Sequence, residues 1–144
     1  MELTNFGAVL TFAAETEASD SGFYTAIREI PGLEKYGSTF EAVAAALKKN
    51  EKDLLRARRE NVTEMILEPI HDFHSESFAA DRSVNDTLTT DAAVEKAIAM
   101  EDKSAEFYSV AAEKLRGLPE VSRILNRVGK IRSVNREKLR DLLR

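Results

Sequence analysis

The chain contains no cysteine and only two histidines among its 144 residues. The absence of cysteine excludes disulfides, thiolate catalysis and cysteine-ligated zinc or iron–sulfur sites, and two histidines limit histidine-based chemistry. No apolar run approaches the ~20 residues that a membrane-spanning helix needs. The N-terminal residues also lack the basic region and apolar stretch of a signal peptide. We therefore expect a soluble, cytoplasmic protein without membrane association.

Proline and glycine are scarce as well, with three and six residues. The prolines separate long segments that are rich in Ala, Leu, Glu, Lys and Arg, the stronger helix formers. Four helices are therefore predicted, near residues 3–30, 39–67, 91–116 and 119–142. The length fits one domain, and 43% hydrophobic with 32% charged residues is typical of a globular chain. We expect a single all-helical domain over residues 1–144.

Inward-facing residues recur in these segments at alternating intervals of three and four, which indicates amphipathic helices. The first segment carries the stripe Leu3, Phe6, Leu10, Ala13, Glu17, Asp20, Tyr24 and Ile27. The last segment carries Val121, Ile124, Val128, Ile131, Asn135 and Leu142, with Leu125 and Leu139 beside them. Local signals predict the helix starts: a capping box at Ser38–Glu41, a cap at Asp91, and Pro119 in a first turn. We expect the glycines inside the helices, among them Gly22 and Gly129, to permit close helix contact.

The lengths of the connections predict the topology. The first and second segments, like the third and fourth, are joined by short connections, so each pair forms an antiparallel hairpin. About twenty residues separate the two hairpins, which is enough to return along the whole bundle. We therefore expect a four-helix bundle with one long crossover between the second and third helices, the ferritin-like arrangement.

An internal repeat relates the two hairpins. The dipeptide Phe-Tyr occurs twice, at 23–24 and 107–108, and each time a glutamate stands six residues before the phenylalanine. These glutamates are Glu17 and Glu101, and both lie on the inward stripe of their helices. A buried carboxylate must be paired, protonated or bound to a cation.

This motif, within four helices and a crossover, resembles the rubrerythrin-like branch of the ferritin-like superfamily. Residues 97–108 match it most clearly. In that family, one glutamate from each of helices 1 and 3 and a Glu-x-x-His pair from each of helices 2 and 4 hold a di-iron centre. The resemblance implies iron as cofactor, with Glu17, Glu51 and Glu101 as its ligands in this chain.

The rest of the di-iron motif is missing. Leu54 stands where the histidine of helix 2 should be, and an 84-residue offset takes Glu51 to Asn135 on helix 4. A register shifted by three puts Arg132 at the glutamate position of helix 4. None of the four predicted helices contains a histidine. Three of about six ligands can be identified, so the site is incomplete.

Three interpretations of these carboxylates remain open. We favour neutralisation by arginines or lysines inside the bundle, because unpaired buried charge is costly. The chain would then be a non-catalytic binding or structural protein. Alternatively, Glu17, Glu51 and Glu101 hold iron and support peroxide or oxygen detoxification as a metal-dependent oxidoreductase. A further alternative is iron storage, which would need a large shell.

The remaining features concern partners and the connection. His71 and His74, near Asp72 and Glu76, could hold a transition metal, but we expect them to lie in solvent while Phe73 and Phe78 pack beneath the crossover. The fourth helix is basic, yet the net charge of −4 and the lack of aromatic residues among its cations argue against nucleic acid. A homodimer is expected because related bundles often pair, and the sequence indicates no particular protein partner.

Overall fold

The computed structural model describes residues 1–61, 69–85 and 87–144. Four long helices make up most of these residues: α1 (Phe6–Ile27), α2 (Gly37–Glu60), α3 (Thr90–Lys114) and α4 (Pro119–Leu142). Two short 3₁₀ turns, η1 (Glu34–Tyr36) and η3 (Ser75–Phe78), lie in the connections. The all-helical class is therefore confirmed. None of the helices described is both long and apolar enough to cross a membrane.

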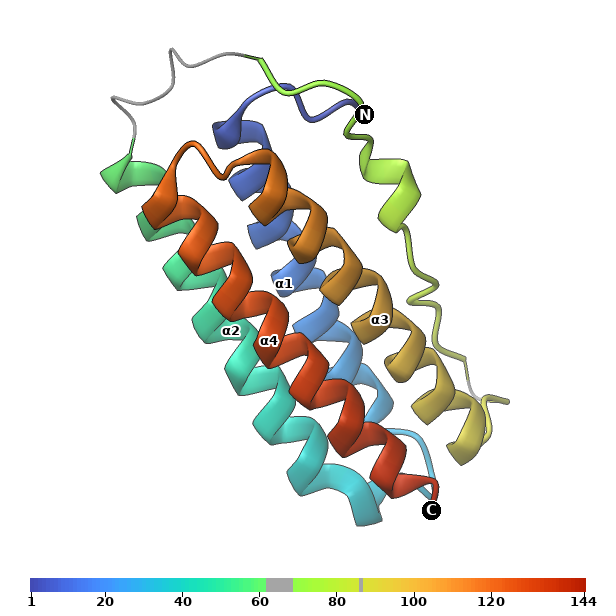
Figure 1. Ribbon diagram of the computed structural model, residues 1–144. Helices are drawn as coiled ribbons and strands as arrows, with labels where there is room; N and C mark the ends of the chain where they lie inside the picture. The colour runs from blue at the N-terminus through green and yellow to red at the C-terminus, as the bar shows by residue number, and fades with distance from the viewer. Residues whose placement is uncertain (62–68, 86) are drawn as a thin grey trace.

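The helices form a bundle of two hairpins. α1 packs along α2, α3 packs along α4, and the hairpins meet where α2 lies beside α4 and α1 beside α3. α2 and α3 run in the same direction, so the chain must return along the bundle between them (Figure 1). The described part of this connection, residues 69–85 and 87–89, runs beside α3.

α1 is shorter than predicted because the first residues take an extended form. Asn5 caps the helix by accepting a hydrogen bond from the backbone NH of Ala8 at 2.8 Å. Before it, the NH of Leu3 donates to the carbonyl of Phe73 at 2.7 Å, and the NH of Ile70 donates to Thr4 at 2.8 Å. The N-terminal segment therefore holds residues 70–75 of the long connection against the end of the bundle.

Two of the predicted helix starts are wrong. The turn η1 leads directly into α2 at Gly37, so Ser38 already lies inside the helix and no side chain caps it. Thr89, not Asp91, caps α3 by accepting from the NH of Ala92 at 3.1 Å. Pro119 begins α4 as predicted. The predicted extension of the second helix through 62–67 lies outside the described residues.

The core consists of two apolar clusters, one towards each end of the bundle. One cluster joins the start of α1 to the end of α3 and the start of α4, and it includes Phe73 from the connection. The other joins the end of α1 to the starts of α2 and α3, and it includes Tyr24 and Phe40. All eight residues of the stripe predicted for the first helix are buried. The two clusters leave the middle of the bundle to polar side chains.

The stripe predicted for the last helix needs correction. The buried residues of α4 are Val121, Leu125, Val128, Arg132, Asn135 and Leu139. Ile124 and Ile131 are only half-buried. The inward face is therefore rotated from the predicted one, and it carries a charged residue at its centre.

One of the helix glycines marks a close contact. A Cβ atom on Gly129 would lie 3.0 Å from the Cβ of Tyr108, whereas a Cβ on Gly22 would meet nothing within 4 Å. Close packing at Gly129 is therefore confirmed, and at Gly22 it is not.

These two glycines give a matched prediction. Gly22→Ala should raise the free energy of unfolding by about 0.5–1 kcal/mol, because alanine favours the helix by that amount. Gly129→Ala should gain less or lose stability, because Tyr108 must shift to admit the methyl group. Urea denaturation of both variants measures the difference, and equal stabilisation would contradict the close contact.

Candidate functional site: a buried guanidinium–carboxylate cluster

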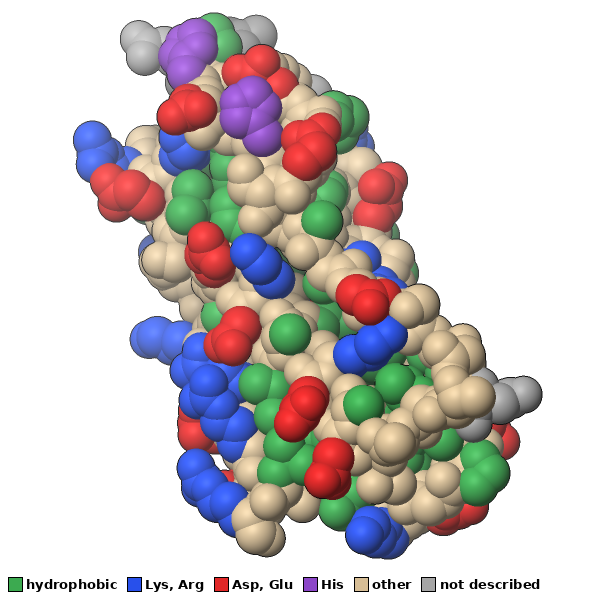
Figure 2. All heavy atoms as spheres, turned by 90° about the vertical axis from the view of Figure 1, so that its right-hand side faces the viewer, with side chains coloured by type: hydrophobic (Ala, Val, Ile, Leu, Met, Phe, Trp, Pro, Cys, Tyr) green, Lys and Arg blue, Asp and Glu red, His purple; other side chains and the backbone are tan. Residues whose placement is uncertain are grey.

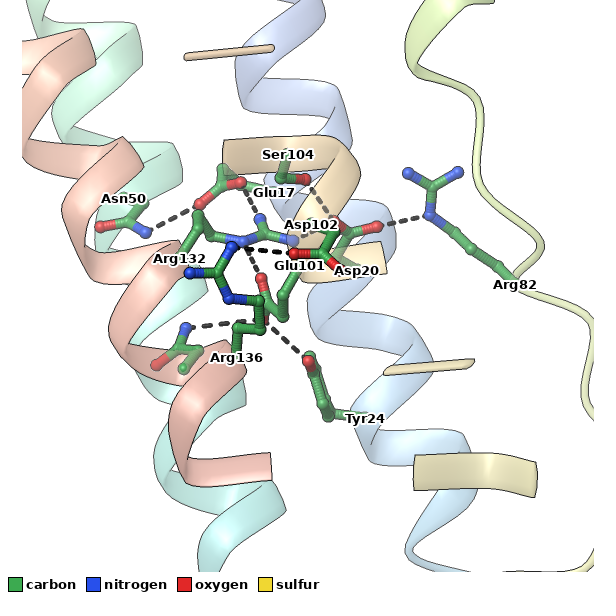
Figure 3. Close-up of polar contacts among 11 residues, drawn as sticks. Glu17, Asp20, Tyr24, Asn50, Arg82, Glu101, Asp102, Ser104, Arg132 and Arg136 are labelled. Carbon is green, nitrogen blue, oxygen red and sulfur yellow. Dashed lines mark hydrogen bonds and ion pairs between the residues drawn. The ribbon is translucent and has the colours of Figure 1, made fainter. Parts of the chain in front are cut away.

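A layer of polar side chains crosses the bundle between the two apolar clusters. All of its members are at most 5% exposed, and every helix contributes: Glu17 and Asp20 from α1, Asn50 from α2, Glu101 and Ser104 from α3, and Arg132 and Asn135 from α4. We call these seven residues the polar layer. Figure 3 shows the six that it labels pointing toward one another between the helices, and Asn135 joins them through Glu101.

Arg132 lies at the centre of this layer and contacts three carboxylates. Its Nε donates to Glu101, its Nη1 to Glu17 and its Nη2 to Asp20. All four side chains are completely buried. The planar, multi-donor shape of a guanidinium suits this arrangement, since one arginine can serve several carboxylates at once.

The other carboxylate oxygens also have donors. Asn50 donates to Glu17 at 2.8 Å, and the hydroxyl of Tyr24 donates to Glu101 at 2.8 Å. Asn135 approaches Glu101 at 3.5 Å, and Ser104 approaches Asp20 at 3.4 Å. The layer therefore follows the rule that buried charges are paired and hydrogen-bonded.

A second arginine reaches the layer from outside the four helices. Arg82, in the long connection, donates from its Nε to Asp20, and its side chain is about one-third exposed. Figure 3 shows it entering from the side of the connection. The connection is thus tied to the middle of the bundle by an ion pair.

Tyr108 is the one buried polar side chain without a hydrogen bond among the described residues. The repeat places it opposite Tyr24: Tyr24 on α1 bonds to Glu101 on α3, and Tyr108 on α3 lies near Glu17 on α1. Burial and the charge of Glu17 raise the pKa of Tyr108 well above its ordinary value. Its hydroxyl therefore stays protonated and available as a donor beside Glu17.

The charges of the layer do not balance when every group is ionised. Three carboxylates face two guanidinium groups, Arg132 and Arg82. Burial raises the pKa of Glu17 from 4.5 to about 7, although Arg132 and Asn50 act to lower it. Burial also raises the pKa of Glu101. A proton on Glu17 would bring the net charge of these three carboxylates and two guanidinium groups to zero. Loss of that proton near pH 7 would leave the layer with a net charge of −1.

The structure brings two of the three predicted metal ligands together. Glu17 and Glu101 are both buried and are joined through Arg132. Glu51 is half-buried and outside the layer, and its neighbour Asn50 contacts Glu17 instead. Sequence reasoning extended the 84-residue offset from the first and third helices to the second and fourth. The contacts instead make Asn50 and Asn135 the equivalent residues, because Asn50 contacts Glu17 and Asn135 approaches Glu101. Their separation is one residue longer than the offset of the repeat.

A di-iron centre does not fit these residues. The guanidinium of Arg132 lies between the carboxylates and uses the oxygens that would bind metal, and its positive charge repels a cation. The layer contains no histidine. In residues 1–61, 69–85 and 87–144, no group of three or more His, Asp or Glu side chains is arranged to hold a metal ion.

The histidines of the connection lie at the surface as expected. His71 is exposed, and the side chain of His74 is 49% exposed with its Nε2 3.7 Å from Asp72. Phe73 is buried and Phe78 is half-buried against the core. Neither histidine reaches the polar layer.

We compared the chain with protein-family models, curated proteins and solved structures, and nothing matches it. Its place in the rubrerythrin-like branch of the ferritin-like superfamily stays a prediction from the sequence.

Proposed function

We propose that this chain is a ferritin-like, rubrerythrin-related bundle with one long crossover, in which a buried guanidinium stands where a di-iron centre would lie. It acts as a non-catalytic binding or structural protein. The observation that carries the proposal is the position of Arg132, whose three nitrogens each contact a carboxylate from α1 or α3. The sequence and the resemblance further suggest a cytoplasmic homodimer.

The arrangement suits a structural role better than a reaction. Arg132 links α4 to α1 and α3, and Asn50 links α2 to Glu17 of α1. Buried polar groups of this kind can select one arrangement of helices, because any slipped register would leave a charge unpaired. Here the layer joins both hairpins in one register. The oxidoreductase and storage alternatives would require Arg132 to leave the layer and new ligands to enter it.

Metal content tests this proposal directly. Protein without a histidine tag, expressed in iron-supplemented medium, should contain much less than one iron per chain by elemental analysis. Glu101→Gln, which removes a carboxylate of the layer, should not change that value. The exposed Glu106→Gln on the same helix is the matched control.

About two irons per chain, lost in Glu101→Gln and kept in Glu106→Gln, would overturn the proposal. Peroxide turnover would then be the next assay. The mass in solution separates a dimer of this 16.1 kDa chain from a large shell.

A further inference from the structure

Two neighbouring hollows share Arg127: the first is lined by α4 and the turn before it, and the second by α2 and α4. The first has a volume of about 650 Å³, and its charged residues are Arg116, Arg123, Arg127 and Lys130. The second has a volume of about 300 Å³ and adds the cations Lys49, Lys52 and Arg56. We call these seven cations and the surface between them the basic groove. Figure 1 shows α2 and α4, the two helices that contribute most of these cations, lying beside each other.

Few negative charges offset these cations. Among the described residues, no carboxylate lines the first hollow, although Arg116 pairs with Glu113 beside it, and Asp53 and Glu60 are the carboxylates that line the second. Asp53 is already engaged by Lys49 at 2.9 Å, Arg127 at 3.0 Å and Arg56 at 3.5 Å. These cations lower the pKa of Asp53 despite its burial, so it stays ionised and holds the three of them in place.

Some cations of the groove have no ion-pair partner among the described residues. Lys52, Arg123 and Lys130 make no ion pair with any residue that the structure describes. Arg123 and Lys130 are exposed on the same side of α4, two turns apart. The local charge of the groove is therefore strongly positive.

The face formed by α3 and the long connection has a different character. Figure 2 shows α3 and the long connection, where carboxylates and cations alternate, and Lys and Arg side chains gather along the left edge. The net charge of −4 is thus an average over unequal faces. At physiological salt, charges act over about 8 Å, so a partner at the groove meets the cations there and not the average.

We propose that the basic groove binds the phosphate backbone of duplex nucleic acid without reading its sequence. Arginine, lysine and amide side chains are the usual donors to phosphate oxygens, and Asn126 lines the first hollow among its four cations. Arg123 to Lys130 span about 10 Å along α4, the length of about three phosphates on one strand, and the cations of α2 widen the surface beside them. No aromatic residue lines either hollow, which disfavours the base stacking that single strands use.

A bilayer and an acidic peptide fit the groove less well. A membrane-binding face presents projecting apolar side chains, whereas the exposed apolar residues of these helices, Leu55 and Val134, line neither hollow. Protein partners usually insert an apolar anchor into a pocket. Within the described part of the chain, the apolar residues that line these hollows are Pro119, Ala57 and Ile124. None of the groove cations belongs to the polar layer. This proposal is therefore independent of the proposal that Arg132 replaces a di-iron centre.

Fluorescence anisotropy with two labelled 20-base-pair DNA duplexes of unrelated sequence tests the proposal on the full chain. Both should bind equally, with a Kd of about 10⁻⁴–10⁻⁶ M. Between 50 and 200 mM salt, the logarithm of the binding constant should fall linearly with a slope of about −3 to −4, which corresponds to about four phosphate contacts.

The variant Arg123→Gln/Lys130→Gln should weaken binding at least tenfold and reduce the slope by about two. Its control, Lys35→Gln/Lys103→Gln, removes the same charge outside the groove and should bind within twofold of the wild type. Thermal melts verify that both variants fold. No binding, an equal loss in the control, or binding only to phosphatidylserine vesicles would each overturn the proposal.

Discussion

Replacing Arg132 with methionine is expected to lower the free energy of unfolding by about 3–5 kcal/mol at neutral pH. Methionine has a long side chain that retains packing in the middle of the bundle, so the main effect of the substitution is electrostatic: the positive charge is lost. Without the guanidinium, Glu17, Asp20 and Glu101 are left buried with no cation among them except Arg82 on Asp20. Urea denaturation monitored by circular dichroism gives the change in free energy.

The control is Arg136→Met, one turn further along α4. Arg136 is partly exposed and pairs with Asp102 at 2.9 Å, so its loss should cost no more than about 1 kcal/mol. If Arg132→Met fails to fold, the triple variant Arg132→Met/Glu17→Gln/Glu101→Gln should recover the fold, because it removes two of the unpaired charges. Equal stability of Arg132→Met and the wild type would show that the layer is not held by this pairing.

The sequence was most informative for the first helix. Its inward residues follow one uninterrupted 3/4 spacing, and every residue of that stripe, including Glu17 and Asp20, is buried. Periodicity succeeds here because the apolar positions on both sides of the carboxylates already fix the inward face. The same reasoning identified Glu101 through the repeated Phe-Tyr motif.

The fourth helix was harder to predict because its inward face depends on distant residues. Hydrophobicity alone favours Ile124 and Ile131 over Arg132, yet the arginine is buried and the isoleucines are half-buried. Arg132 is stable there only because carboxylates from α1 and α3 meet it, and helix periodicity carries no information about such partners. The useful signal was the excess of inward carboxylates, which requires a buried cation.

Glu51 shows a different limit of sequence reasoning. The repeat superposes α1 on α3, but the two hairpins have connections of unequal length, Arg28–Tyr36 and Leu115–Leu118. The offset therefore need not continue into the second helix of each hairpin. A difference of one residue turns a side chain by about 100° around a helix. That rotation is enough to place Asn50 in the polar layer and Glu51 beside it.

Glu17 is expected to make the stability of the protein depend on pH. Its pKa rises from 4.5 to about 7 on folding, chiefly because burial disfavours the charged form. The folded state therefore binds this proton more tightly than the unfolded state does. The resulting stabilisation is complete below pH 4.5 and is lost as the pH rises through about 7, and a shift of this size corresponds to about 3 kcal/mol.

The variant Glu17→Gln isolates this contribution, because glutamine resembles the neutral acid in shape and does not titrate. The unfolding free energy of the wild type and of the variant is measured from pH 4.5 to pH 8. As the pH rises over this range, the wild type should lose up to about 3 kcal/mol of stability relative to the variant. Glu15→Gln, exposed on the same helix and outside the polar layer, should follow the wild type at every pH. Parallel curves for the wild type and Glu17→Gln would mean that the carboxylate stays ionised throughout. In that case Arg132, with Asn50 and Tyr108, compensates fully for its burial, and the layer holds its excess negative charge at all these pH values.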